Sequence, residues 1–142
     1  MSGAPPLVEG RQSLIPDWSL VLPFPMARRV EDGSLVFWHS PQGLTFWINA
    51  YDAGEPDDAL AEWQEIHAAA AFDLIEERES GFIRFAYRLD EGEGDGRQPA
   101  FYGFACARDG GQIHIAGYFD DPSLLGAVLA TWRSLRFGPA LQ

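Results

Sequence analysis

The sequence predicts an α+β fold in which a mainly antiparallel sheet carries two amphipathic helices. Alternating apolar runs recur along the chain and are joined by short turns, which is typical of antiparallel sheets. Two stretches, 56–71 and 121–137, instead space their apolar residues as one face of a helix. The predicted element order is β-β-β-α-β-β-β-β-α.

The chain has 142 residues and is 46% hydrophobic, which is enough for one domain with a real core. We place this single α+β domain at 18–138. Residues 1–17 carry three prolines up to position 16 and little periodicity, so they predict a flexible N-terminal tail. Residues 139–142 are expected to be a short C-terminal tail.

The strands before the first helix follow from turns and alternation. Residues 18–24 predict a short strand, which prolines at its end confine to a sheet edge. The Glu-Asp-Gly-Ser turn at 31–34 predicts a hairpin between its flanking runs. The strand at 44–51 places Trp47 opposite its apolar set, so this ring is expected to be partly exposed or covered by the N-terminal tail.

The first helix is predicted from an acidic first turn with Pro56 near its start. Its apolar stripe consists of Leu60, Trp63, His67 and Ala70. Two strands follow at 72–79 and 82–89, and an acidic, glycine-rich connection at 90–98 leads to the last hairpin.

The chain ends in a hairpin that runs into the second helix. Asp109-Gly110-Gly111 joins two apolar runs and predicts a two-residue loop at 109–110 or 110–111. That register predicts one face for Phe104, Cys106, Ile113, Ile115, Gly117 and Phe119, and the other face for Ala105, Ala107, His114, Ala116 and Tyr118. We expect the first face to receive the second helix, which Asp121 caps and Pro122 begins.

The net charge of −11 and the pI near 4.5 argue against binding to nucleic acid or to an anionic membrane surface. A basic protein partner is compatible with this charge. All ten basic residues are Arg, which we attribute to the composition of the source genome. A lone cysteine excludes an internal disulfide, and no stretch resembles a secretory signal, so we expect a cytoplasmic protein.

Three patterns resemble the PsbP-like superfamily, which includes the Ran-binding Mog protein, photosystem PsbP and small bacterial relatives. They are Leu22-Pro23-Phe24-Pro25, the run GLTFWI at 43–48 and Trp132-Arg133-Ser134-Leu135-Arg136-Phe137. The resemblance, with the element order over 18–137, implies an α/β/α sandwich around an antiparallel sheet. It also implies a partner or chaperone role without catalysis. Some bacterial relatives accompany type VI secretion effectors.

No residue pattern predicts catalysis, a cofactor or a metal site. Cys106 and His114 would be the only nucleophile pair, but the predicted register places them on opposite faces. His39, His67 and His114 lie on three separate elements without metal-ligand spacing. The acidic residues from Asp90 to Asp95 lack the spacing of a calcium-binding loop, and glycine patterns for phosphate binding are missing from the sequence.

The predicted binding surface is the outward sheet face, with Arg84, Arg88, His114 and Tyr118 around small alanines. The alternative is that the first helix or the N-terminal strands cover this face and that Glu76 or Glu77 pairs with the arginines.

We therefore expect a non-enzymatic protein-binding module, such as an adaptor, chaperone or immunity-type protein linked to bacterial secretion. The alternative is a small-molecule binder or enzyme with a pocket between sheet and helices, lined by Trp38, Trp47 and Trp63. A homodimer that pairs through its sheets is a third hypothesis.

Overall fold

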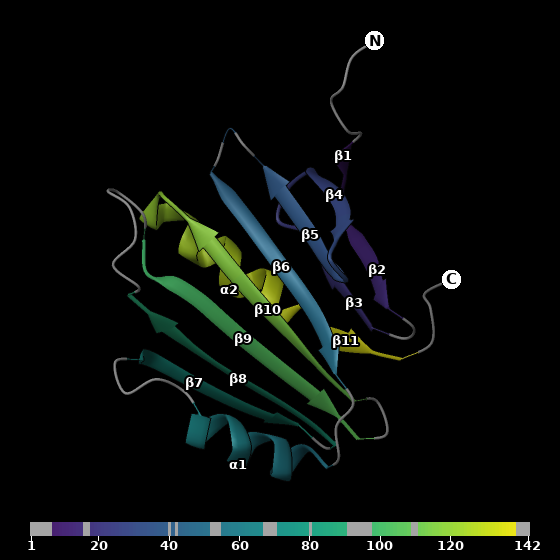
Figure 1. Cartoon of the computed structure of the whole chain (residues 1–142), viewed down its shortest axis with the longest axis vertical. Helices are drawn as coiled ribbons and strands as arrows, with labels where there is room; N and C mark the ends of the chain where they lie inside the picture. Colours follow the sequence, from purple (N-terminus) through teal and green to yellow (C-terminus); the bar gives the residue numbers. More distant parts are fainter. Residues whose placement is uncertain are drawn as a thin grey trace.

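The computed structural model contains a large antiparallel sheet, a small sheet and two helices (Figure 1). The structure describes residues 7–15, 18–39, 41, 43–51, 55–66, 71–79, 81–90, 98–108 and 111–138. The elements are β1 (Leu7–Val8), β2 (Arg11–Ile15), β3 (Trp18–Val21), β4 (Met26–Glu31), β5 (Ser34–His39), β6 (Leu44–Tyr51), α1 (Pro56–Ile66), β7 (Phe72–Glu79), β8 (Phe82–Leu89), β9 (Ala100–Ala107), β10 (Gly111–Phe119), η2 (Pro122–Leu124), α2 (Leu125–Arg133) and β11 (Arg136–Phe137).

The large sheet contains eight strands in the order β1-β4-β5-β6-β10-β9-β8-β7. All neighbouring strands pair antiparallel. The chain builds one half of the sheet with β4, β5 and β6, passes through α1, and builds the other half from the edge strand β7 inward. β10 therefore closes the sheet at its centre by pairing with β6 (Figure 1).

The small sheet joins the two ends of the described chain. Its order is β11-β3-β2, so β3 pairs with both a neighbouring strand and the last strand. The Ser134 hydroxyl at the end of α2 accepts a hydrogen bond from the backbone N–H of Val21, at 2.7 Å. The second helix and the N-terminal strands are thereby fixed to each other.

The main core lies between α2, the small sheet and one face of the large sheet, which we call the inner face. Val128 and Trp132 of α2 are completely buried there. A close approach is possible because β9 has a glycine beneath the helix: a Cβ atom on Gly103 would lie 2.5 Å from the Trp132 ring. The Asp121 carboxylate accepts the backbone N–H of Ser123 at 2.9 Å, so Asp121 caps the short 3₁₀ turn η2 that leads into α2 and not α2 itself, whose N-cap is Leu124.

The opposite face of the large sheet, which we call the outer face, carries α1 at one end. This helix packs on β8 and β9. Leu60 and Trp63 are buried against Phe85, Phe104 and Cys106 in a second, smaller core. Leu60 and Trp63 of the predicted apolar stripe therefore face the sheet. The other two members, His67 and Ala70, lie outside the described residues.

The predicted α/β/α sandwich with two amphipathic helices is wrong. The structure is dominated by strands, with eight of the eleven in one sheet. On the inner face α2 shares its layer with the small sheet, and on the outer face α1 reaches only one end. The predicted order has three strands before the first helix, where the structure has six, and none after the second helix. The missed strands include β1, β2 and β11, whose two to five residues between prolines, glycines and a helix end give almost no alternation.

The predicted register of the last hairpin is also wrong. Ala107 pairs with Gly111, so three residues separate the strands, and Cys106 lies opposite Gln112. One added loop residue exchanges the faces of a whole strand. The inner face therefore receives Phe101, Gly103, Ala105, Ile113 and Ile115, while Phe104, Cys106, His114, Ala116 and Tyr118 lie on the outer face.

The N-terminal region contains β1 and β2 where the sequence predicts a flexible tail. Residues 1–6 and the predicted C-terminal tail at 139–142 lie outside the described residues. Neither described helix has the length and apolar character that crossing a membrane requires.

Candidate functional site

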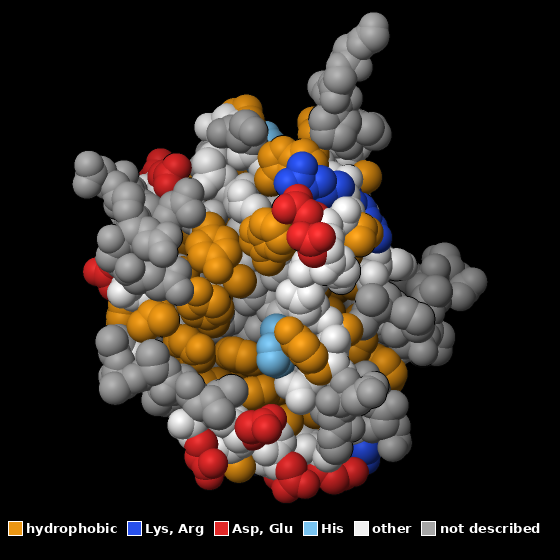
Figure 2. All heavy atoms as spheres, viewed as in Figure 1, with side chains coloured by type: hydrophobic (Ala, Val, Ile, Leu, Met, Phe, Trp, Pro, Cys, Tyr) orange, Lys and Arg blue, Asp and Glu red, His pale blue; other side chains and the backbone are white. Residues whose placement is uncertain are grey.

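The outer face beyond α1 presents aromatic side chains across several strands. Figure 2 looks onto this face and shows a band of hydrophobic atoms with one imidazole in its middle. We call its central part the aromatic surface. Its members are half-buried side chains that rise from β5, β6, β10, β9 and β8: Trp38, Trp47, Tyr87, Tyr102, Ala116 and Tyr118.

The register of the sheet places these residues in rows that cross the strands. Ala116 lies between Trp47 on one neighbouring strand and Tyr102 on the other. Tyr102 in turn pairs with Tyr87, and their ring centroids lie 5.6 Å apart. Because alanine is small, it leaves a low point in this row between larger rings.

A shallow hollow of roughly 380 Å³ opens at the β5 and β6 end of the aromatic surface. Two of the predicted pocket residues, Trp38 and Trp47, line it. The remaining lining comes from Arg29, Val36, Thr45 and Tyr118.

The Arg29 guanidinium stands at the edge of this hollow. The Arg29 side chain lies over the Trp38 ring, with 4.8 Å between the guanidinium carbon and the ring centroid. It also forms an ion pair with Glu31. The charge of Arg29 is therefore partly compensated before any ligand arrives.

Trp63, the third predicted pocket residue, does not reach the hollow. It is buried under α1, and its indole N–H donates to the side-chain oxygen of Gln112 at 2.9 Å. Its role here is to fix α1 on the sheet.

His114 shares the same amide oxygen. Its Nε2 lies 2.6 Å from Gln112 Oε1, which already accepts from Trp63. Because this oxygen can only accept, Nε2 carries the proton and Nδ1 is the basic nitrogen. The imidazole packs against Phe104 and Tyr51, and burial lowers the pKa of His114 to about 4. The ring is therefore neutral at physiological pH.

Cys106 lies on the same face as His114, against the prediction of opposite faces. The two are not direct cross-strand partners, since Cys106 opposes Gln112 and His114 opposes Phe104. Burial raises the pKa of the Cys106 thiol to about 11, with a smaller contribution from the charge of Glu55. The thiol form therefore predominates at neutral pH, whereas nucleophilic attack needs the thiolate.

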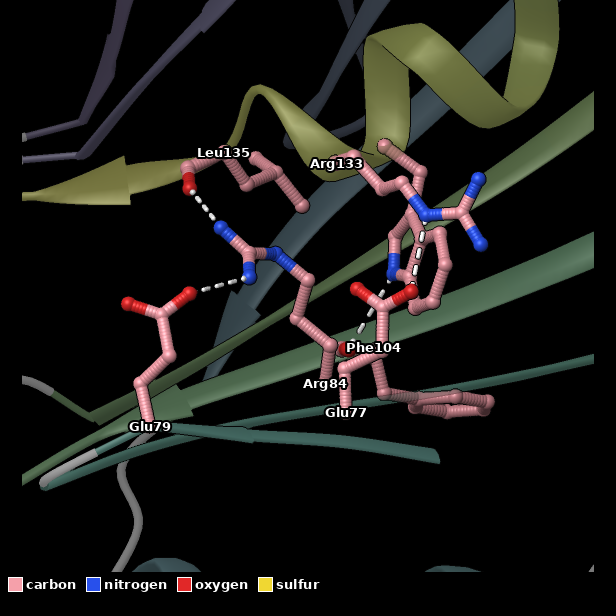
Figure 3. A network of polar contacts seen from close by, with 7 residues as sticks. Glu77, Glu79, Arg84, Phe104, Arg133 and Leu135 are labelled. Carbon is pink, nitrogen blue, oxygen red and sulfur yellow. Dashed lines mark hydrogen bonds and ion pairs between the residues drawn. The ribbon is translucent and has the colours of Figure 1, made fainter. Parts of the chain in front are cut away.

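The structure separates the four residues of the predicted binding surface. His114 and Tyr118 lie on the outer face, but Arg84 belongs to the inner face and is 9% exposed. Figure 3 shows how its guanidinium reaches the end of α2 and donates to the carbonyl of Leu135, at 3.0 Å. It also pairs with Glu79 at 3.1 Å. Arg84 thus connects β8 to the α2–β11 junction.

Arg88 is on the inner face as well. Its guanidinium lies over the Phe119 ring and donates to the Pro99 carbonyl at 3.1 Å. Burial lowers the pKa of Arg88, and the charge of Asp73 partly opposes this shift. Both predicted arginines therefore lie on the α2 side of the sheet, and the surface with His114 and Tyr118 is lined by aromatic residues instead.

The sequence analysis missed Tyr102, Tyr87 and Ala116 as parts of one surface. Side-chain alternation along β8, β9 and β10 would have predicted that these residues share a face, but only with the correct register of the last hairpin. Among the described residues, no group of three or more His, Cys, Asp or Glu side chains is arranged to hold a metal ion. His39 packs against Phe24 instead, and His67 lies outside the described residues.

The chain matches no protein-family model, and a search of curated proteins returns no match.

Proposed function

We propose that this protein is a non-enzymatic module that binds another protein through the aromatic surface of its outer face. The observation that supports this proposal is a continuous set of tryptophan and tyrosine rings that α1 leaves uncovered. Soluble proteins seldom expose contiguous apolar surface without an interaction to use it. Trp and Tyr are also the residue types that contribute most to protein interfaces.

The shape of the aromatic surface suits a partner protein that inserts a side chain into it. Ala116 makes a low point between Trp47 and Tyr102, into which a side chain of a partner fits. Rings held on strands lose little freedom on binding, because the sheet already fixes their positions. The role that suits such a module is that of a cytoplasmic adaptor, chaperone or immunity-type protein.

A second candidate function is the binding of a small molecule in the hollow beside Trp38. The hollow falls within the size range of ligand sites, about 300–1,000 Å³, and offers the Arg29 guanidinium and the hydroxyls of Thr45 and Tyr118. It is shallow, however, and most ligand sites enclose their ligand. We therefore favour the protein partner.

The proposal is tested by an Ala116→Arg variant. We expect the long cationic side chain to fill the low point and to weaken the binding of the natural partner by at least about tenfold, the effect of losing one central interface contact. The partner is identified by cross-linking and mass spectrometry in the source cells. Its affinity is then measured by calorimetry with both purified proteins.

The matched control is Ala130→Arg, which makes the same substitution on the exposed side of α2. This variant should bind the partner as the unchanged protein does. Equal binding by the Ala116→Arg variant, with circular dichroism showing an intact fold, would disprove the proposed function. A purified small molecule that binds in place of any protein would establish the second candidate.

A further inference from the structure

Two polar side chains on the outer face have hydrogen-bonding groups that no described residue satisfies. They are Asn49 on β6 and His114 on β10, which lie directly opposite each other in the sheet. Both residues are half-buried, and the row that they form is next to the row of Trp47 and Ala116. The aromatic surface therefore has a polar pair at its border.

The His114 imidazole offers an acceptor. The indole N–H of Trp63 can only donate, so the Gln112 atom that it meets is the amide oxygen, and His114 Nε2 must donate to the same oxygen. Because burial keeps the ring neutral, Nδ1 is unprotonated. It makes no hydrogen bond to a described residue. The enclosed side-chain atoms that lack a partner in the described part of the chain are the Nε atoms of Arg84 and Arg88, so Nδ1 is open to solvent.

The Asn49 side chain offers a donor. Its Oδ1 accepts the Ser34 hydroxyl at 2.7 Å, which orients the amide, and its NH2 group makes no hydrogen bond to a described residue. An amide NH2 group can only donate. Cross-strand neighbours have Cα atoms about 4.5–5.5 Å apart, so this donor and the Nδ1 acceptor of His114 occupy adjacent positions of the outer face.

An adjacent donor and acceptor match the side-chain carboxamide of glutamine or asparagine. Its C=O and N–H leave one edge of a planar group, so it accepts from Asn49 and donates to His114 at once. A trans peptide unit directs its N–H and C=O to opposite sides. A carboxylate has no proton to donate to Nδ1, and an ammonium or a guanidinium has no lone pair for the Asn49 NH2 group. A hydroxyl would have to meet both groups with one atom.

The low point at Ala116 fits the apolar part of such a side chain. Residues that share a face of a strand are about 6.8 Å apart. A glutamine side chain with its two methylenes over Ala116 therefore directs its carboxamide towards the row of Asn49 and His114. The rings of Tyr51 and Phe104 lie against the imidazole. Hydrogen bonds that form beside apolar rings are stronger than those in water.

We propose that the partner inserts a glutamine side chain that packs on Ala116 and forms hydrogen bonds with Asn49 and His114. This inference rests on the proposed function and specifies the chemistry of its partner. The carboxamide oxygen accepts from the Asn49 NH2 group, and the carboxamide N–H donates to His114 Nδ1. His114 is thereby a specificity-determining residue, and its bond to Gln112 fixes the tautomer that recognition needs.

The test uses propionamide, which is the side chain of glutamine as a free molecule. Binding to the full chain is followed by NMR spectroscopy, which detects weak ligands and reports on the Asn49 NH2 group and on His114 Nδ1. We expect saturable shifts at both groups. Butanone keeps the C=O but has a methyl group in place of the NH2 group, so it should bind about two- to tenfold more weakly, the loss of one net hydrogen bond. Equal binding of butanone or of 1-propanol, or shifts at other residues alone, would overturn the inference.

A set of variants separates recognition from stability. His114→Gln keeps a donor for Gln112 and removes the acceptor at the Nδ1 position, so propionamide should bind about two- to tenfold more weakly. His114→Asn places an amide oxygen near the Nδ1 position and loses the bond to Gln112, so binding should persist while the melting temperature falls. The opposite order would show a purely structural histidine and would overturn the inference. Asn49→Ala should also weaken binding, whereas Gln64→Ala, which removes an exposed amide from α1, should leave it unchanged.

The natural partner separates this inference from the proposed function. If the partner loses affinity for Ala116→Arg but binds His114→Gln and Asn49→Ala as it binds the unchanged protein, it uses the aromatic surface without the polar pair. The inference then fails and the proposed function stands. If the partner binds Ala116→Arg with unchanged affinity, the proposed function fails and the inference fails with it.

Discussion

His114 shows how the packing of a sheet face controls an ionisable side chain. Its Nε2–H is committed to Gln112, and aromatic rings of Phe104 and Tyr51 lie against the imidazole. Charging the ring would place a cation at a buried position, where it loses its hydration, and burial therefore lowers the pKa of His114. The side chain therefore contributes shape and a hydrogen bond to the outer face and no charge.

The depressed pKa of His114 predicts a loss of stability in acid. The folded-state pKa is about 4 and the ordinary value is 6.5, so the unfolded chain binds more protons between these values. The stabilisation is present above pH 6.5 and is lost as the pH falls towards 4. Between pH 7 and about pH 4.5, we expect the unfolding free energy to fall by roughly 2 kcal/mol more than in a His114→Gln variant.

Urea unfolding followed by tryptophan fluorescence measures this difference. The carboxylates titrate in both proteins, so the comparison isolates the imidazole. Parallel pH profiles for the two proteins would show that His114 is not held neutral by the fold.

At the scale of the element, α2 depends on a close contact with β9. A Cβ atom at Gly103 would lie 2.5 Å from the Trp132 ring and 2.7 Å from the Phe101 ring, both of which are buried. We expect Gly103→Ala to destabilise the protein by about 1–3 kcal/mol, the usual cost of overpacking a core. Thermal and urea unfolding both measure this change.

Gly126 provides the control for that substitution. It lies on α2, is exposed, and has no atom near the position of an added Cβ. Gly126→Ala should stabilise the protein by about 0.5–1 kcal/mol, because alanine is the better helix former. Stabilisation by both alanines would mean that α2 does not sit on β9 as described.

The hairpin of β9 and β10 shows which part of the fold the sequence predicts. Its apolar runs and its Asp-Gly-Gly turn correctly predict two paired strands and a following helix. The loop length decides the register, and one extra residue moves His114 and Phe104 to the same face. Both faces of this sheet are apolar, so the hydrophobic pattern does not select between the two registers.

The two arginines of β8 were assigned to the wrong face for a related reason. Arg84 and Arg88 alternate with apolar residues, a pattern that usually means an outward polar face. In the structure Arg84 is buried because Leu135, 51 positions away, supplies an acceptor. Such a distant partner leaves no trace in the local pattern. Trp38 and Trp47, in contrast, alternate with core residues along β5 and β6, so their common face was open to prediction, although the predicted pocket between sheet and helices was placed with Trp63 as a third member.

At the scale of the molecule, the two faces of the large sheet have different tasks. The inner face is closed by α2 and the small sheet and contains most of the buried apolar residues. Among the described elements, α1 is the one that covers part of the outer face. Substitutions in the aromatic surface should therefore have little effect on the packing of the main core.

The closure of the inner face depends on a link between the ends of the described chain. Ser134 accepts from the Val21 N–H, and Arg11 donates to the Ser134 carbonyl at 3.3 Å. We expect Ser134→Ala to lower the unfolding free energy by about 1–2 kcal/mol, since it leaves the Val21 N–H without its acceptor. Hydrogen exchange at Val21 should also become faster.

Ser13→Ala is the matched control, since this exposed hydroxyl makes no hydrogen bond to a described residue. Unchanged exchange at Val21 in the Ser134→Ala variant would contradict the role given to the link.

The same link bears on the order of events during synthesis. Val21 leaves the ribosome long before Ser134, from which 113 positions separate it. Until the later segment emerges, β3 lacks the strand that completes its sheet, and the apolar side of the large sheet has no lid. Contacts between such distant positions form slowly. The inner face of the large sheet therefore stays open to water, and accessible to a chaperone, until the segment that contains Ser134 has been synthesised.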